Sequence, residues 1–100
     1  MLQILEHHGR MMTVLPLIGE FLGTFLFVIS ILVTGNPVVI GAVLALVIWL
    51  LSKISGGHVN PAVSLAFLLK GNLSYTEMAA YTLAQLVAAA ASVYAYKALV

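Results

Sequence analysis

The feature that most constrains this chain is a polar, glycine-rich turn at residues 55–59, which lies between strongly hydrophobic stretches and runs into a proline-started apolar segment. Asn60 is a preferred helix N-cap, and Pro61 suits the first helical position because the N–H it lacks would have no partner there. Gly71 supplies the residue that favours the left-handed conformation just beyond a helix end. We therefore expect a helix over residues 61–70 that is about 15 Å long, roughly half of a hydrocarbon core.

The composition indicates what surrounds this turn. The chain has 100 residues, of which 63% are hydrophobic and 7% charged, and a soluble domain of this size could not bury so much apolar surface. The net charge of +1 gives no footprint for nucleic acid, and the lack of cysteine excludes disulfides and thiolate chemistry. The sequence predicts an all-α membrane protein with three transmembrane helices and one re-entrant half-helix. It offers no constellation of an enzyme, and we expect neither a cofactor nor a metal.

The segment of mixed polarity is residues 1–13, which contains Glu6, His7, His8 and Arg10. We interpret it as an interfacial leader. A secretory signal is disfavoured because the apolar run that follows is too long and is not closed by a small-residue cleavage site. The two adjacent histidines would point to different sides of a helix, so we predict no metal site there.

Residues 14–100 are interpreted as one membrane unit. Pro37 follows a short Gly-Asn turn, and Ser74 with Glu77 three residues later has the pattern of a capping box, so both positions predict helix starts. The expected helices cover about residues 14–34, 38–54, 61–70 and 74–100.

Two polar side chains fall inside these spans. Glu20 lies about a turn and a half into the first span, where an unpaired carboxylate is costly, so we expect it to face the bundle and accept hydrogen bonds. A proton relay is the alternative, but no second intramembrane carboxylate is available for it. Gln85 is expected to find a buried backbone partner, with a pore-lining role as its alternative. Gly19 and Gly23 have the spacing that allows close helix contact.

The run Ser-Gly-Gly-His-Val-Asn-Pro-Ala-Val at residues 55–63 closely resembles the first Asn-Pro-Ala loop of the aquaporins and aquaglyceroporins, the major intrinsic protein family. Residues 19–25 resemble the first helix of that family, and residues 81–85 resemble its third. The resemblance extends from about Pro16 to the C-terminus. It implies a passive channel built around a single-file pore.

The resemblance also implies roles for individual residues. Glu20 would brace the re-entrant loop, His58 would pack against Glu20, and Asn60 would point its amide into the pore. If the Asn60 oxygen caps the half-helix, its NH₂ group remains to donate to a neutral acceptor such as water, and the helix dipole disfavours cations there. The alternative is that Asn60 merely caps a short helix. The expected pore-lining residues are Gly56, Gly57, His58, Asn60, Pro61, Ala62, Ile40, Ile48 and Val63, and the expected loop-bracing residues are Glu20 and Gln85.

Family members contain two such halves related by inversion, whereas this sequence has one. We therefore expect two copies to associate antiparallel so that both Asn60 side chains meet at the midplane, and the family's tetramers suggest four such dimers together. The alternative is a different partner chain that carries the second half. Three cations, Arg10, Lys53 and Lys70, fall on the N-terminal side and Lys97 falls opposite, a mild bias toward a cytoplasmic N-terminus that is compatible with insertion in both orientations.

This sequence departs from the family's pattern at the narrowest part of the pore. Counting back from Asn60, the family's aromatic filter position falls on Ile40. In an antiparallel dimer, the partner copy would bring its Ile48 to the filter and its Val63 to the position where the family's second loop has arginine. An aliphatic, uncharged constriction would discriminate less than a strict water channel and would admit small neutral solutes such as glycerol or urea.

The predicted function is a passive channel in an integral, multi-pass membrane protein whose partners are the bilayer, a second copy of the chain, and water or small uncharged solutes. Two other classes are compatible with the sequence. One is a non-conducting membrane assembly or membrane-disrupting protein, and the other is an ion-conducting channel of dual topology.

Overall fold

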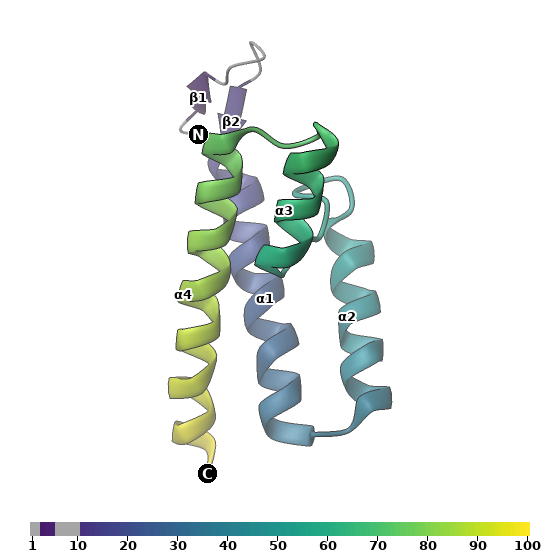
Figure 1. Cartoon of the computed structure of the whole chain (residues 1–100). Coiled ribbons are helices and arrows are strands. Elements are labelled where there is room, and N and C mark those ends of the chain that lie inside the picture. The colour runs from purple at the N-terminus through teal and green to yellow at the C-terminus, as the bar shows by residue number, and fades with distance from the viewer. Residues whose placement is uncertain (1–2, 6–10) are drawn as a thin grey trace.

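The computed structural model describes residues 3–5 and 11–100 of the chain, and within them it contains two short strands and four helices (Figure 1). Strands β1 (Gln3–Leu5) and β2 (Met11–Thr13) pair antiparallel, with Gln3 opposite Thr13. The all-α prediction therefore holds from residue 14 onward, and a short strand pair precedes the first helix. The two histidines of the leader, His7 and His8, lie outside the described residues, as do Glu6 and Arg10.

The helices are α1 (Val14–Thr34), α2 (Pro37–Leu51), α3 (Pro61–Lys70) and α4 (Tyr75–Leu99). Short-range signals fix most of their ends. Gly35 ends α1 in the left-handed conformation, at φ 56°, and its N–H donates to the Ile31 carbonyl. The side chain of Asn36 then caps α2 by accepting from two backbone N–H groups. Ser74 and Glu77 form the capping box of α4.

The second helix is shorter than the sequence predicts, since it ends at Leu51 and not near Ile54. The N–H groups of Ile54, Ser55 and Gly56 all converge on the Leu51 carbonyl, at 2.9 to 3.0 Å, which replaces the helical pattern with a tight turn. Ser52 and Lys53 follow Leu51 and are compatible with a last helical turn, and Ile54 is apolar again, so hydrophobicity alone did not reveal where the helix stops.

The helices form a bundle in which α1 lies between α2 and α4, and α3 packs against α4 at the end where the N-terminus lies (Figure 1). Both α1 and α4 run from that end to the opposite end, where the C-terminus lies. Among the described residues, α1 and α4 are the two helices that are long and apolar enough to cross a membrane, whereas α2 and α3 are shorter apolar helices. Of the three transmembrane helices predicted from the sequence, two therefore meet this criterion of length and hydropathy.

The contact between α1 and the end of α2 depends on two glycines. A Cβ added at Gly23 would lie 2.7 Å from a Leu51 methyl and 2.8 Å from a Val47 methyl, and one at Gly19 would lie 2.9 Å from Leu51. Leu51, Val47 and Val59 form the apolar cluster of the interior. The Gly-x-x-x-Gly face of α1 therefore receives α2 and the loop that follows it.

Polar side chains make up much of the remaining interior, while the outer surface is apolar. Glu20, Gln85 and Ser64 are all less than 2% exposed, whereas Trp49 is 72% and Leu69 is 79% exposed. This inside-out distribution suits a protein whose surroundings are hydrocarbon.

Candidate functional site

The half-helix α3 is capped by Asn60, a residue with an extended backbone that is exposed. Its Oδ1 accepts a hydrogen bond from the Ala62 N–H at 2.8 Å, and its carbonyl accepts from the Ser64 N–H at 3.1 Å. The side-chain NH₂ group makes no hydrogen bond to any of the described residues. Two donors therefore remain available beside the positive end of the α3 dipole.

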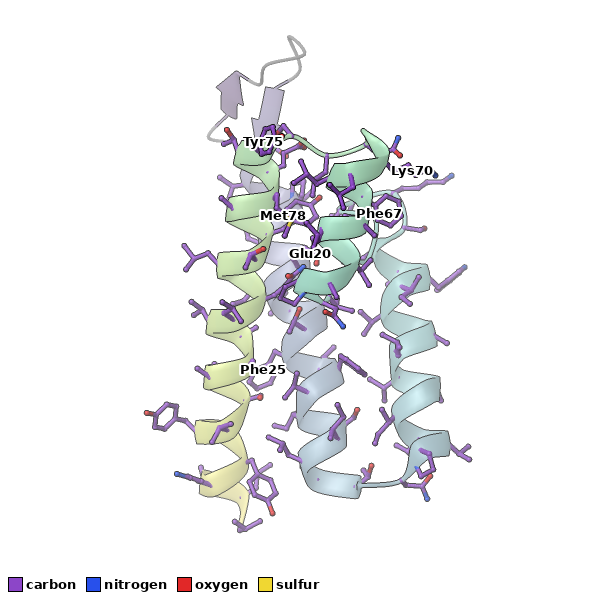
Figure 2. The ribbon with its side chains drawn as sticks, viewed as in Figure 1. Glu20, Phe25, Phe67, Lys70, Tyr75 and Met78 are labelled. Atoms are coloured by element: carbon purple, nitrogen blue, oxygen red, sulfur yellow. The ribbon has the colours of Figure 1, made fainter. Side chains whose placement is uncertain are left out.

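The loop that leads to Asn60 is held by Glu20, which is 0% exposed (Figure 2). Glu20 Oε2 accepts from the Ser55 hydroxyl at 2.6 Å and from the His58 N–H at 3.0 Å. Its Oε1 accepts from the Val59 N–H at 2.7 Å and from Gln85 Nε2 at 2.9 Å. Four donors thus surround one carboxylate, which satisfies polar groups that would otherwise be buried and unpaired.

Gln85 joins the same network from α4. Its Nε2 donates to Glu20 Oε1 and also to the Ser64 hydroxyl, at 3.0 Å. The expected backbone partner of Gln85 is therefore wrong, because two side chains take both of its N–H groups. Since Gln85 is 1% exposed, it does not line a pore in this chain. It joins α1, α3 and α4.

His58 has its ring turned into the protein. The ring stacks on Phe67, with centroids 4.6 Å apart, and lies 5.0 Å from the Tyr81 ring, while Nδ1 is 2.9 Å from the Ser64 hydroxyl. Only 6% of the residue is exposed. The His58 ring therefore does not face an opening, and the link of this residue to Glu20 is made by its backbone N–H.

The other expected pore-lining residues lie in two places. The structure leaves Gly56, Asn60, Ala62 and Val63 exposed and Pro61 partly exposed, all around the start of α3. On α2, Ile48 is 42% exposed and Ile40 is partly exposed. Gly57 is buried against α2, where an added Cβ would lie 2.9 Å from Ile48 Cα. The loop therefore meets α2 at Ile48, and Ile40 lies about two turns away along the helix.

Three residues of the network were not predicted from the sequence. Ser55 donates to Glu20 and accepts from the Gly57 N–H, the Tyr81 hydroxyl donates to the Ser55 carbonyl at 2.7 Å, and Ser64 links Gln85 to His58. Two of them could have been found from the sequence. Tyr81 is four residues before Gln85 and so shares its helix face, and Ser64 is the lone hydroxyl within residues 61–70. In the part of the chain that is described, no group of three or more His, Cys, Asp or Glu side chains could hold a metal ion.

A short helix and an irregular loop, held by a buried carboxylate within a bundle of apolar helices, are features of helical membrane proteins, which tolerate non-helical backbone where it is buried in protein. The chain belongs to the major intrinsic protein family, whose sequence model matches residues 31–99. With its two long apolar helices, this membership makes it an integral membrane protein.

Individual relatives agree. The chain is 36% identical over 90 residues to aquaglyceroporin AqpS of Rhizobium meliloti, which covers 74% of this chain and 39% of the relative. It is 37% identical over 87 residues to the lens fiber major intrinsic protein of Gallus gallus, and this match covers 75% of this chain and 33% of the relative. For the glycerol uptake facilitator protein of Streptococcus pneumoniae the identity is 33% over 90 residues, and the match covers 69% of this chain and 37% of the relative. The chain thus spans between a third and two fifths of the length of these curated relatives.

Proposed function

We propose that this chain lines half of a passive transmembrane pore for water and small uncharged solutes, with Asn60 as a donor at the midplane. The observation that carries the proposal is that the oxygen and the NH₂ group of the Asn60 side chain are used differently. Its oxygen accepts a hydrogen bond from the Ala62 N–H, at 2.8 Å, while its NH₂ group has no partner among the described residues, and the residue is exposed.

The electrostatics of this position favour neutral traffic. The amide N–H groups donate to the oxygen of water or of an alcohol, and the partial positive charge at the start of α3 repels cations. From residue 55 to residue 63 the sequence contains no Lys, Arg, Asp or Glu, and the nearby Glu20 carboxylate is buried and surrounded by four hydrogen-bond donors.

A half-helix of 10 residues extends about 15 Å, which serves one side of the membrane only. We infer that the second half comes from another copy in the antiparallel orientation, so that two Asn60 side chains meet, and that α2 crosses the membrane as the third span, beside α1. The exposed apolar faces of α2 and α3, including Val38 and Leu69, would be covered in such a dimer. Four dimers together would match the family's tetramers, and a different chain carrying the second half is the alternative.

The narrowest part of the proposed pore is aliphatic. Ile48 and Val63 are exposed near the loop, Ile40 lies farther along α2, and none of the three bears a charge. Such a constriction binds water weakly and excludes polyols less strictly than a ring with a fixed cation. The names of two of the relatives, an aquaglyceroporin and a glycerol uptake facilitator, agree with solutes of this size.

Osmotic swelling and electrical current in liposomes test the proposal with one matched pair of variants. Asn60→Asp keeps a good N-cap but replaces a lumenal donor with a negative acceptor, so we expect a several-fold loss of water flux and the appearance of a cation current. The control is Asn36→Asp, since Asn36 caps α2 in the same manner at an exposed turn. It should leave flux and current unchanged.

The same assay separates the alternatives. If Asn60→Asp changes neither flux nor current, Asn60 does not line a pore. A wild-type protein with no water flux would support a non-conducting assembly, and one that carries current would support an ion channel.

Labelling from outside the cell tests the antiparallel pair. The sequence has no cysteine, so Gln3→Cys gives a single reactive thiol near the N-terminus. We expect an impermeant thiol reagent to label about half of the chains in intact cells and all of them after permeabilisation. Labelling that is all or none in intact cells would eliminate the antiparallel homodimer and favour a separate partner chain.

A further inference from the structure

Two buried polar atoms lack a hydrogen-bond partner within the described residues: Thr24 Oγ1 on α1 and Gln85 Oε1 on α4. Thr24 is 3% exposed and Gln85 is 1% exposed. Buried polar atoms are almost always satisfied by protein or by ordered water, so each of these atoms needs a partner. Because both are buried within the chain, neither a lipid nor a second protein could reach them.

Thr24 differs from other hydroxyls on the long helices. Ser30 donates to the Phe27 carbonyl at 2.6 Å, Thr34 to the Ser30 carbonyl at 2.7 Å, and Ser92 to the Ala89 carbonyl at 2.7 Å. Each of these side chains satisfies itself on its own helix. Thr24 does not, so its proton and its lone pairs are directed elsewhere.

The orientation of the Gln85 amide is fixed by its neighbours. Nε2 donates to Glu20 Oε1 at 2.9 Å and to Ser64 Oγ at 3.0 Å. Turning the amide over would place Oε1 against a carboxylate oxygen, which brings two acceptors together. Oε1 is therefore the atom on the far side of the network, and it requires a donor.

The two atoms belong to the same layer of the α1–α4 contact. Thr24 is one turn along α1 from Glu20, and Glu20 is hydrogen-bonded to Gln85. Ala88, three residues after Gln85 on α4, is fully buried and has only a methyl group. A direct hydrogen bond between Thr24 and Gln85 is not formed.

We propose that one water molecule is bound inside the protein between Thr24 Oγ1 and Gln85 Oε1. Water supplies what both atoms lack, because it donates to the amide oxygen and accepts from the threonine hydroxyl at the same time. It holds the far side of the Gln85 amide and so keeps the near side aimed at Glu20 and Ser64, the contacts that fix the half-helix. This water is structural and separate from any water that passes Asn60, so the inference does not depend on pore function.

The first test is a structure at a resolution that shows ordered water, determined for the wild type, Thr24→Val and Thr24→Ser. We expect a peak within roughly 2.6 to 3.2 Å of both atoms in the wild type and in Thr24→Ser, and its loss in the isosteric Thr24→Val. The proposal is overturned by an empty site in the wild type, by a direct contact between Thr24 Oγ1 and Gln85 Oε1, or by a peak that persists in Thr24→Val.

A second measurement needs only the wild-type protein. Gln3 and Gln85 are the two glutamines of the sequence, so isotopic labelling of glutamine gives two side-chain amides in solid-state NMR spectra of the protein in bilayers. We expect the Gln85 amide, assigned by the loss of the other signal in Gln3→Glu, to show a cross-peak to a water that exchanges slowly with bulk solvent. A Gln85 amide with no water cross-peak would contradict the proposal.

Discussion

The chain contains two Asn-Pro helix starts, and they differ in what holds the backbone before them. At both, the asparagine oxygen accepts backbone N–H groups of the helix that follows, α2 after Asn36 and α3 after Asn60. Before Asn36 there is a simple turn through Gly35, with nothing within 4 Å of an added Cβ. Before Asn60 there are left-handed conformations at Gly56, Gly57 and Val59, and a buried carboxylate from another helix holds the loop. The same local signal thus makes a connection at one place and a candidate pore site at the other, and the long-range partner decides which.

Replacing Glu20, the partner that holds the second loop, should have the largest effect on stability. Glu20→Gln replaces one acceptor oxygen with an NH₂ group in a site where all four neighbours donate, so we expect a loss of about 3 kcal/mol or more. The half-helix should detach, and water flux should fall with stability. Thermal unfolding in detergent measures the change.

The control for this variant is Glu77→Gln, because glutamine also fits the capping box of α4. It should cost less than about 1 kcal/mol. Equal stability of Glu20→Gln and Glu77→Gln would show that the carboxylate does not hold the loop.

The two turns can next be compared directly by adding a methyl group to each. Both Gly35 and Gly57 have positive φ, 56° and 66°, so alanine is strained at either position. At Gly57 the new Cβ would also meet the Ile48 backbone at 2.9 Å, whereas at Gly35 it meets nothing. We expect Gly35→Ala to cost about 1 kcal/mol and Gly57→Ala about 3 kcal/mol.

Flux measurements extend this pair. Gly57→Ala should displace the loop and reduce water flux, and Gly35→Ala should leave it intact. Similar losses of stability in the two variants would mean that the contact between the loop and α2 is loose.

The smallest expected effect on stability comes from removing a single hydrogen bond to the loop before Asn60. Tyr81→Phe removes the hydroxyl that donates to the Ser55 carbonyl at 2.7 Å, which should cost about 1 kcal/mol. Tyr75→Phe is the matched control, since Tyr75 is 80% exposed. Denaturation curves that coincide for the two variants would remove Tyr81 from the set of residues that hold the loop.

Local chemistry explains how much of this could be predicted from the sequence. The start of α3 at Pro61, its end at Gly71 and the capping box at Ser74 depend on neighbouring residues only, and the structure has them where the sequence predicts them. The burial of Glu20 followed from the cost of a carboxylate in a membrane.

The rest depended on the tertiary structure. The end of α2 at Leu51 is set by a turn whose N–H groups converge on one carbonyl, and the sequence around Leu51 contains neither glycine nor proline to mark it. The partners of Gln85 and the inward ring of His58 come from contacts between segments that are 21 or more residues apart, or between side chains that face each other across the start of α3. A residue's type indicated that it needed a partner, but not which one.

The parallel course of α1 and α4 has a consequence for how such a unit can be duplicated. One end of the unit is near its N-terminus and the opposite end holds its C-terminus (Figure 1). If the unit crosses the membrane three times, as proposed above, a second copy joined head to tail would start on the far side of the membrane and insert upside down, with no added segment to carry the chain across. An even number of crossings would return the chain to its starting side and would require an extra helix. Inverted symmetry is thus the default outcome of a simple gene fusion of this unit.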